Sequence, residues 1–152
     1  ELYENHLTIL TPLPRQDAHH LQRVTRMWEA TGARVVTMAI EHHDQILAAT
    51  SHLPHMLAYA LVDCLAGMQT RDEIFQYAAG GFADFTRIAS SNPQMWADIC
   101  MANRDNLVSV LERFDAHIQD IKQAIAAGNS DVLLAIFSRA KNSRDEFNKK
   151  RQ

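Results

Sequence analysis

Residues 41–65 read EHHDQILAATSHLPHMLAYALVDCL, and this stretch decides the fold of the chain. Leucines recur at every fourth position from Leu53 to Leu65, and alanines fill other faces, which is typical of a helix that is apolar over most of its circumference. We therefore expect a buried helix. Pro54 has no N–H to donate to the carbonyl four residues earlier, and its ring crowds that carbonyl, so we predict a bend at this position.

The bend gathers polar groups in apolar surroundings. Ser51, His52 and His55 lie within one turn of Pro54 along the sequence. Because polar groups without partners are costly away from water, their presence here suggests a binding site. A lone histidine in a helix can equally be a hydrogen-bonded core residue, so both interpretations of His55 stay open at this point.

Composition places the chain among ordinary globular domains. It has 152 residues and a net charge of −3, which give no reason to expect a nucleic acid or a membrane surface as a partner. The most apolar run is too short to span a bilayer. Cys64 and Cys100 show no CxxC spacing, which favours buried free thiols in a reducing cytoplasm.

The first 38 residues differ in pattern from the rest. Residues 6–10 and 33–38 are short apolar or β-branched runs typical of strands, and residues 17–31 have a helical pattern between them. Two short strands cannot form an independent sheet. We therefore predict that residues 1–38 are a remnant of the end of a longer βα domain and that residues 39–152 form an all-helical domain.

The helical part continues to the C-terminus. Residues 71–77 and 82–90 have helical patterns, and Asn92 followed by Pro93 predicts the start of another helix. From Leu107 to Ile125, apolar residues alternate spacings of four and three, which is typical of a seam against another helix of the same chain or of a twin subunit. The predicted fold class is therefore mainly α, preceded by a small strand–helix–strand unit.

The sequence carries no recognisable nucleophile or nucleotide-binding motif. The glycines form neither GxGxxG nor a P-loop, so we expect no cofactor to be bound by this chain alone. His52 and His55 lack a third metal ligand at a defined spacing, so we predict no metal site. Arg87 is suited to hold a carboxylate by two parallel hydrogen bonds; the alternative pairs it with Asp84 as an ordinary surface ion pair.

Two runs together, HDQILAATSHLPHMLAYALVD and GGFADFTRIASSNPQMWADI, resemble the prephenate dehydrogenase family with its arogenate and cyclohexadienyl relatives. ILTPLP at residues 9–14 resembles the end of that family's nucleotide-binding domain. The resemblance implies a helical dimerisation and substrate-binding domain, like the C-terminal domain of 6-phosphogluconate-dehydrogenase-like enzymes, and a homodimer of interlocked helices. It also implies NAD- or NADP-dependent oxidative decarboxylation of prephenate to 4-hydroxyphenylpyruvate in tyrosine biosynthesis, an oxidoreductase reaction.

The resemblance also assigns roles to residues. Arg87 would hold a substrate carboxylate, and His55 would contact the side chain of the substrate. Residues expected to line the pocket are His43 and Trp96, and residues expected to support it are Ser51, His52, Pro54 and Asp84. The catalytic histidine and the glycine-rich fingerprint of the family belong to the dinucleotide domain, so we expect no catalytic residue here and an inactive chain on its own.

Alternatives remain at this stage. The substrate is prephenate or arogenate, the cofactor of the longer enzyme is NAD or NADP, and tyrosine is a candidate feedback inhibitor. A second hypothesis is a non-catalytic helical dimer that senses an aromatic amino acid such as tyrosine. A third is a helical interaction domain without a ligand, in which the histidines are core residues.

Overall fold

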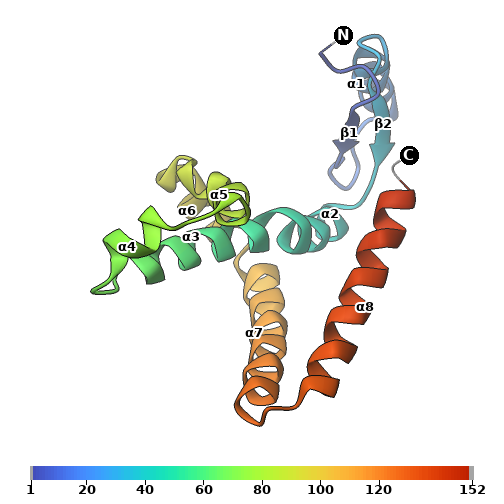
Figure 1. Ribbon diagram of the computed structural model, residues 1–152. Helices are drawn as coiled ribbons and strands as arrows, with labels where there is room; N and C mark the ends of the chain where they lie inside the picture. Colours follow the sequence, from blue (N-terminus) through green and yellow to red (C-terminus); the bar gives the residue numbers. More distant parts are fainter. Residues whose placement is uncertain (1, 151–152) are drawn as a thin grey trace. The chain divides into compact units, whose positions relative to one another are not determined.

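A computed structural model describes residues 2–150 of the chain (Figure 1). The described part is helical apart from one two-stranded sheet, so the predicted mainly α fold with a small strand–helix–strand unit is confirmed. The chain divides into two compact units, Glu1–Val108 and Ser109–Gln152. None of the described helices is both long and apolar enough to cross a membrane.

The strand–helix–strand unit consists of β1 (Leu7–Leu10), α1 (Ala18–Glu29) and β2 (Arg34–Thr37). The strands are parallel, with Leu7 opposite Arg34 and Leu10 opposite Thr37. The Asp17 carboxylate accepts hydrogen bonds from the backbone N–H groups of His19 and His20, which caps α1. The three predicted elements are therefore confirmed, and each strand is only four residues long.

The central stretch forms one continuous helical rod with a change of winding in the middle. It comprises α2 (Ile40–Leu47), the π-helical turn η1 (Ala48–His52) and α3 (Leu53–Ala66). The N–H of Leu53 donates to the carbonyl of Ala48, five residues earlier. A wide turn thus lies directly before Pro54 and places the proline at the start of α3, where its missing N–H is tolerated, while the bend predicted at Pro54 stays a prediction.

The expectation that this rod is buried is wrong for the single chain. Its only buried residues are Ala48, His52 and Ala58, while the leucines of the four-residue repeat are partly exposed. The reason is that α3 packs against α4, α5 and η2, which cover one part of its circumference. The cysteine expectation fails as well, because Cys64 is exposed and Cys100 is only partly buried.

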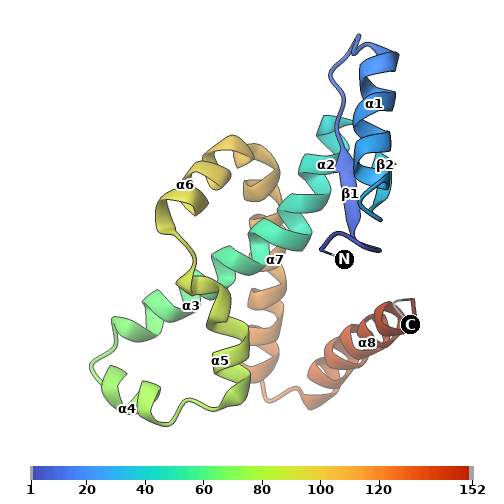
Figure 2. The same ribbon diagram turned by 90° about the horizontal axis from the view of Figure 1, so that it is seen from above.

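Four short elements come after α3: α4 (Arg71–Gln76), α5 (Gly80–Thr86), the 3₁₀ turn η2 (Arg87–Ser90) and α6 (Pro93–Ala102). The Asn92 side chain accepts from the N–H of Met95, so the predicted helix start is confirmed. Figure 1 shows α5 and α6 above α3, and Figure 2 shows them on opposite sides of the rod when it is seen from above. The hydroxyl of Tyr59 in α3 donates to the carbonyl of Ser91 at 2.7 Å, which ties α3 to the residue directly after η2.

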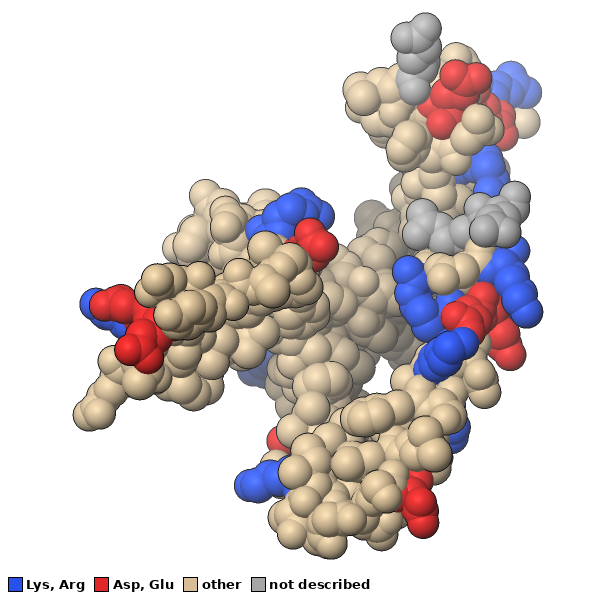
Figure 3. Space-filling model, in the orientation of Figure 1, with Lys and Arg blue, Asp and Glu red and all other residues tan. Residues whose placement is uncertain are grey.

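The last two helices are α7 (Arg104–Ala126), which crosses from the first unit into the second, and α8 (Ser130–Lys149). They are joined at Gly128, which has a φ of 63°, and from there they diverge (Figure 2). The predicted seam is covered at Leu107, which is 4% exposed, but Ile118 and Ile125 are 42% and 62% exposed. Where α7 and α8 meet, the visible surface is mostly uncharged, and charged side chains gather toward the C-terminal end of α8 (Figure 3).

Candidate functional site

The structure brings both histidines of the SHLPH segment against one tryptophan. The His55 ring stacks on the Trp96 ring, with centroids 3.6 Å apart and an angle of 21° between the planes. The His52 ring meets the same indole edge-on, at 6.1 Å and 76°. Since Trp96 comes from α6, the rod and α6 together form this cluster, which we call the His–Trp cluster (His52, His55 and Trp96).

His52 and His55 lie three positions apart, and residues with this spacing share one face of a helix, so both can reach the indole. A π-turn adds one residue to a helix and rotates the residues after it, and such turns are frequent at functional sites. His52 is the last residue of the turn, and His55 lies in the first turn of α3. The carbonyl of Ser51 lies 2.8 Å from Nδ1 of His55, and the supporting roles expected of Ser51 and Pro54 stay predictions.

Trp96 is 7% exposed, yet its indole N–H has no acceptor among the described residues. A buried donor without an acceptor costs about 1–3 kcal/mol. An oxygen atom supplied at this point by a bound ligand (the guest) or by a partner protein would remove that cost. The unpaired N–H therefore favours a binding role for the cluster over a purely structural one.

His52 is held by a residue that the sequence did not single out. The side-chain Nδ2 of Asn103 lies 3.3 Å from Nδ1 of His52 and donates to the carbonyl of Asp44 at 2.7 Å. Burial lowers the pKa of His52; the nearby Asp44 carboxylate opposes this, and His43 and His55 add smaller lowering effects. Asn103 comes directly after α6, and no motif or spacing connects it to a histidine that precedes it by 51 positions.

His43 has a partner of its own. Its Nδ1 lies 2.9 Å from Oδ1 of the adjacent Asp44, and both side chains are partly exposed. Within residues 2–150, no hydrogen bond or ring contact joins His43 to His55 or Trp96. Its predicted place in the pocket lining stays a prediction.

Arg87 begins η2, which packs against α3. Its guanidinium is exposed and makes no hydrogen bond or ion pair with any described residue, so the surface pair with Asp84 is not formed. A cation without a partner remains available for an anionic guest. The turn η2, which begins with Arg87, packs against α3, which carries His55, and the convergence of the two side chains on one guest stays a prediction.

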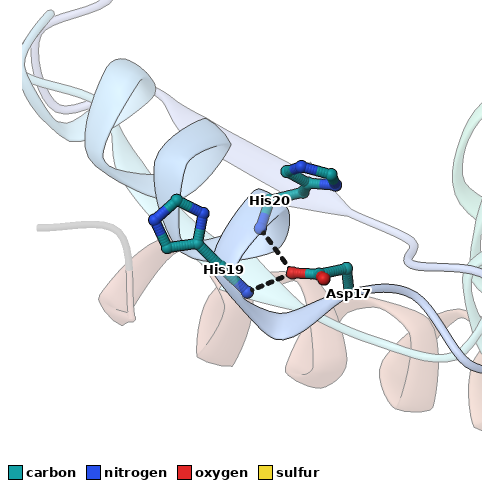
Figure 4. A group of neighbouring side chains, drawn as sticks. All are labelled: Asp17, His19 and His20. Atoms are coloured by element: carbon teal, nitrogen blue, oxygen red, sulfur yellow. Dashed lines mark hydrogen bonds between the residues drawn. The ribbon is translucent and has the colours of Figure 1, made fainter.

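One group of three metal-binding residue types occurs among the described residues: Asp17, His19 and His20 (Figure 4). All three are exposed, and the Asp17 oxygen that faces the helix already accepts two backbone hydrogen bonds. They lie at the N-terminus of α1, where the helix dipole disfavours a cation. The group belongs to the strand–helix–strand unit and shares no residue with the His–Trp cluster.

Comparison with known proteins gives a consistent result. The profile of the family described as prephenate dehydrogenase, dimerization domain, matches residues 39–139. The chain is 40% identical over 146 residues to the cyclohexadienyl dehydrogenase of Zymomonas mobilis, and this alignment covers 95% of this chain and 50% of that protein. It is 36% identical over 148 residues to the prephenate dehydrogenase of Bacillus subtilis, covering 95% of this chain and 39% of that protein.

Solved structures agree with the sequence relatives. A crystal structure of prephenate dehydrogenase from A. aeolicus in complex with hydroxyphenyl propionate and NAD+ superimposes with a TM-score of 0.88 and 40% identity, over 96% of this chain and 51% of that one. Synechocystis arogenate dehydrogenase gives a TM-score of 0.84 and 25% identity, over 96% and 54%. The chain thus spans about half the length of these relatives, or less.

Proposed function

Because the chain belongs to the family of prephenate dehydrogenase dimerization domains, we propose that it is the substrate-binding and dimer-forming part of a dehydrogenase that oxidatively decarboxylates prephenate or arogenate. The products would be 4-hydroxyphenylpyruvate and tyrosine, respectively. The observation that carries the proposal is the His–Trp cluster at the π-turn, within the 39–139 segment that matches the family. A cytoplasmic location and a place in tyrosine biosynthesis follow from the same proposal.

The chemistry of the site suits such a substrate. Prephenate carries two carboxylates and a ring, so it needs a cation, neutral hydrogen-bond donors and a flat apolar surface. The unpaired Arg87 guanidinium offers the cation, and the indole N–H of Trp96 offers a buried donor. We propose that Arg87 and His55 hold the substrate, that His43 and Trp96 line the pocket, and that Ser51, His52, Pro54 and Asp84 support it.

The described residues do not fit a nicotinamide dinucleotide. The adjacent pair Gly80 and Gly81 opens α5, a helix of seven residues that is not preceded by a strand. A dinucleotide fingerprint needs a strand, a glycine-rich turn and a helix in direct succession. We propose that residues 1–38 complete a dinucleotide domain of a longer protein, that NAD or NADP binds there, and that the chain alone is inactive.

The decisive experiment uses the full-length protein that contains this chain. We expect it to reduce NAD or NADP in the presence of prephenate or arogenate, and we expect the 152-residue chain alone not to do so. Arg87→Ala in the full-length protein should raise KM about tenfold or more, since a hydrogen bond to a charged group contributes about 1.5–3 kcal/mol. Arg113→Ala, which alters an exposed arginine of α7, is the matched control.

The outcomes separate the hypotheses. If the full-length protein oxidises neither substrate, the dehydrogenase proposal is wrong. Tyrosine binding without oxidation would favour the aromatic amino acid sensor instead. An unchanged KM in Arg87→Ala would remove Arg87 from the site and leave the dehydrogenase assignment intact.

The second half of the proposal is a homodimer. Leu134 and Phe137 on α8 are 66% and 55% exposed, and Ile118 and Ile125 on α7 are likewise uncovered. A groove of about 480 Å³ between α7 and α8 has a mixed lining, with the apolar residues Ala124, Ala127, Val132, Ala135 and Ile136 and the polar residues Asp120, Gln123, Asn129 and Arg139. Apolar helix faces of this extent mark a protein interface, and we propose that a second copy of the chain fills the groove.

Sedimentation measures this directly. We expect a dimer at micromolar concentration, and we expect Phe137→Asp to shift it toward monomer because the substitution places a charge in an apolar interface. Ser138→Asp adds the same charge at the next position, on a polar exposed residue, and should leave the dimer intact. A folded monomer of the parent chain would contradict the interlocked-helix proposal.

A further inference from the structure

The orientation of the Asn103 amide is fixed by its surroundings. Asn103 is 8% exposed, and the nitrogen of its amide lies 2.7 Å from the carbonyl oxygen of Asp44. A carbonyl can only accept, so this side of the amide is the NH₂ group. The amide oxygen accepts in turn from Nδ2 of Asn106 at 2.9 Å, which agrees with this orientation.

The same NH₂ group determines which nitrogen of His52 carries the proton. Its second hydrogen is available to Nδ1 of His52, 3.3 Å away, and a donor requires a lone pair on that nitrogen. Neutral His52 therefore carries its proton on Nε2. A neutral ring agrees with its 9% exposure, because burial disfavours the charged form.

His55 has the opposite arrangement. Its Nδ1 lies 2.8 Å from the carbonyl of Ser51, so this nitrogen must donate, and the neutral ring keeps its lone pair on Nε2. Both rings contact Trp96, at 6.1 Å for His52 and 3.6 Å for His55. The two imidazoles of the cluster thus present Nε2 atoms of opposite hydrogen-bonding character.

We propose that Asn103 is a positioning residue that holds His52 as a neutral Nε2–H donor for an oxygen atom of the guest, so that His52 contacts the guest directly in addition to supporting the pocket. No described residue makes a hydrogen bond with Nε2 of His52, so the donor is available. A neutral donor can bind a carboxylate or carbonyl oxygen without the cost of burying a charge. The part of the inference that concerns the guest rests on the proposed function, whereas the proton position does not.

The proton positions can be read from ¹⁵N NMR spectra of the imidazole rings in the 152-residue chain at neutral pH. Signals of His52 are assigned by their loss in His52→Asn, and those of His55 by their loss in His55→Asn. We expect a protonated Nε2 and an unprotonated Nδ1 for His52, and the reverse for His55, which serves as an internal control. A protonated Nδ1 on His52 in the parent spectrum would overturn the inference without any Asn103 variant.

Two variants test whether Asn103 is responsible. Asn103→Asp replaces the donor by an acceptor, so the proton of His52 should move to Nδ1; Asn103→Leu removes the donor and should leave a mixture of the two forms. The His55 pattern should not change in either variant, which shows that the fold around α3 is intact. If His52 keeps its protonated Nε2 in both variants, Asn103 is not the positioning residue.

Activity separates this inference from the proposed function. In the full-length protein, Asn103→Leu should raise KM for prephenate or arogenate about threefold to tenfold, as expected for one lost hydrogen bond, with kcat less affected. If the NMR pattern is as expected but KM does not change, His52 does not touch the guest, and that part of the inference is wrong. If the pattern is as expected but the parent oxidises neither substrate, the proposed function fails and the role of Asn103 in fixing the proton stands.

Discussion

The hydrogen bond from Tyr59 to Ser91 offers a sensitive test of how the candidate site is held together. The phenol hydroxyl in α3 donates to the backbone carbonyl of Ser91 at 2.7 Å, across 32 positions of sequence. Ser91 is the residue after η2, and its own N–H donates to the carbonyl of Ile88 within that turn. The bond therefore fixes the turn that begins with Arg87 against the rod that carries His55.

Tyr59→Phe removes the hydroxyl and little else. A neutral hydrogen bond contributes about 0.5–1.5 kcal/mol net to stability. A buried carbonyl left without its donor costs about 1–3 kcal/mol, and a partly buried carbonyl such as that of Ser91 costs only part of this amount. Since both residues are partly buried, we expect a loss of about 1–2 kcal/mol in the free energy of unfolding. For a chain of this length that corresponds to a fall in Tm of about 2–8 °C.

Urea unfolding followed by tryptophan fluorescence measures the loss at fixed protein concentration. Tyr77→Phe is the matched control, because Tyr77 is 78% exposed and its hydroxyl makes no hydrogen bond within residues 2–150. In the full-length protein, under the proposed dehydrogenase activity, Tyr59→Phe should also raise KM more than Tyr77→Phe does. Equal unfolding midpoints for the two variants would refute the reasoning, because the bond would then contribute nothing to holding η2 on α3.

Two further predictions concern local features of the chain. Asn92→Ala should lower the free energy of unfolding by about 1 kcal/mol, because the Asn92 side chain caps α6 by accepting a hydrogen bond from the N–H of Met95. Asn92→Ser keeps a capping oxygen and should cost less. Identical urea midpoints for the two variants would contradict this prediction. Burial lowers the pKa of His52 below its ordinary value of 6.5. As the pH falls, the unfolded chain therefore binds a proton on this ring at a higher pH than the folded chain does. Stability should consequently fall as the pH drops below about 6.5. His52→Asn should weaken this fall between pH values of about 7.5 and 5.5 in urea titrations, and an unchanged slope would show that His52 does not contribute to it.

Much of the fold could be predicted because its signals are local. Asn92 with Pro93 predicts a helix start, and the structure shows the cap; the β-branched run before the central rod predicts a strand, and β2 lies there. Pro54 predicted a bend; the structure shows a π-turn that ends at His52, two residues before the proline, and the bend itself stays a prediction. The buried state of the rod was predicted wrongly for the single chain, because burial depends on what packs around a helix and not on its own leucines.

The candidate site was predicted in part. His52, His55 and Trp96 were named from the sequence, and the structure places them in ring contact, while their roles toward a substrate stay predictions. Asn103 was missed, since an asparagine directly after a helix looks like an ordinary boundary residue. His43 was expected at the pocket, and the structure shows it paired with Asp44.

The sequence by itself determined where the cap at Asn92 starts a helix and which family the chain resembles, because caps, prolines and apolar spacing act within a few residues of one another; it did not place the start of α5 at Gly80 or its change to a 3₁₀ turn at Arg87. Only the tertiary structure decided that Asn103 meets His52, that the indole N–H of Trp96 has no acceptor within residues 2–150, and that the apolar faces of α7 and α8 remain uncovered. The physical reason is that hydrogen-bond partners and covered surfaces depend on the packing of segments distant in sequence, and no local pattern of residues encodes which distant segment arrives.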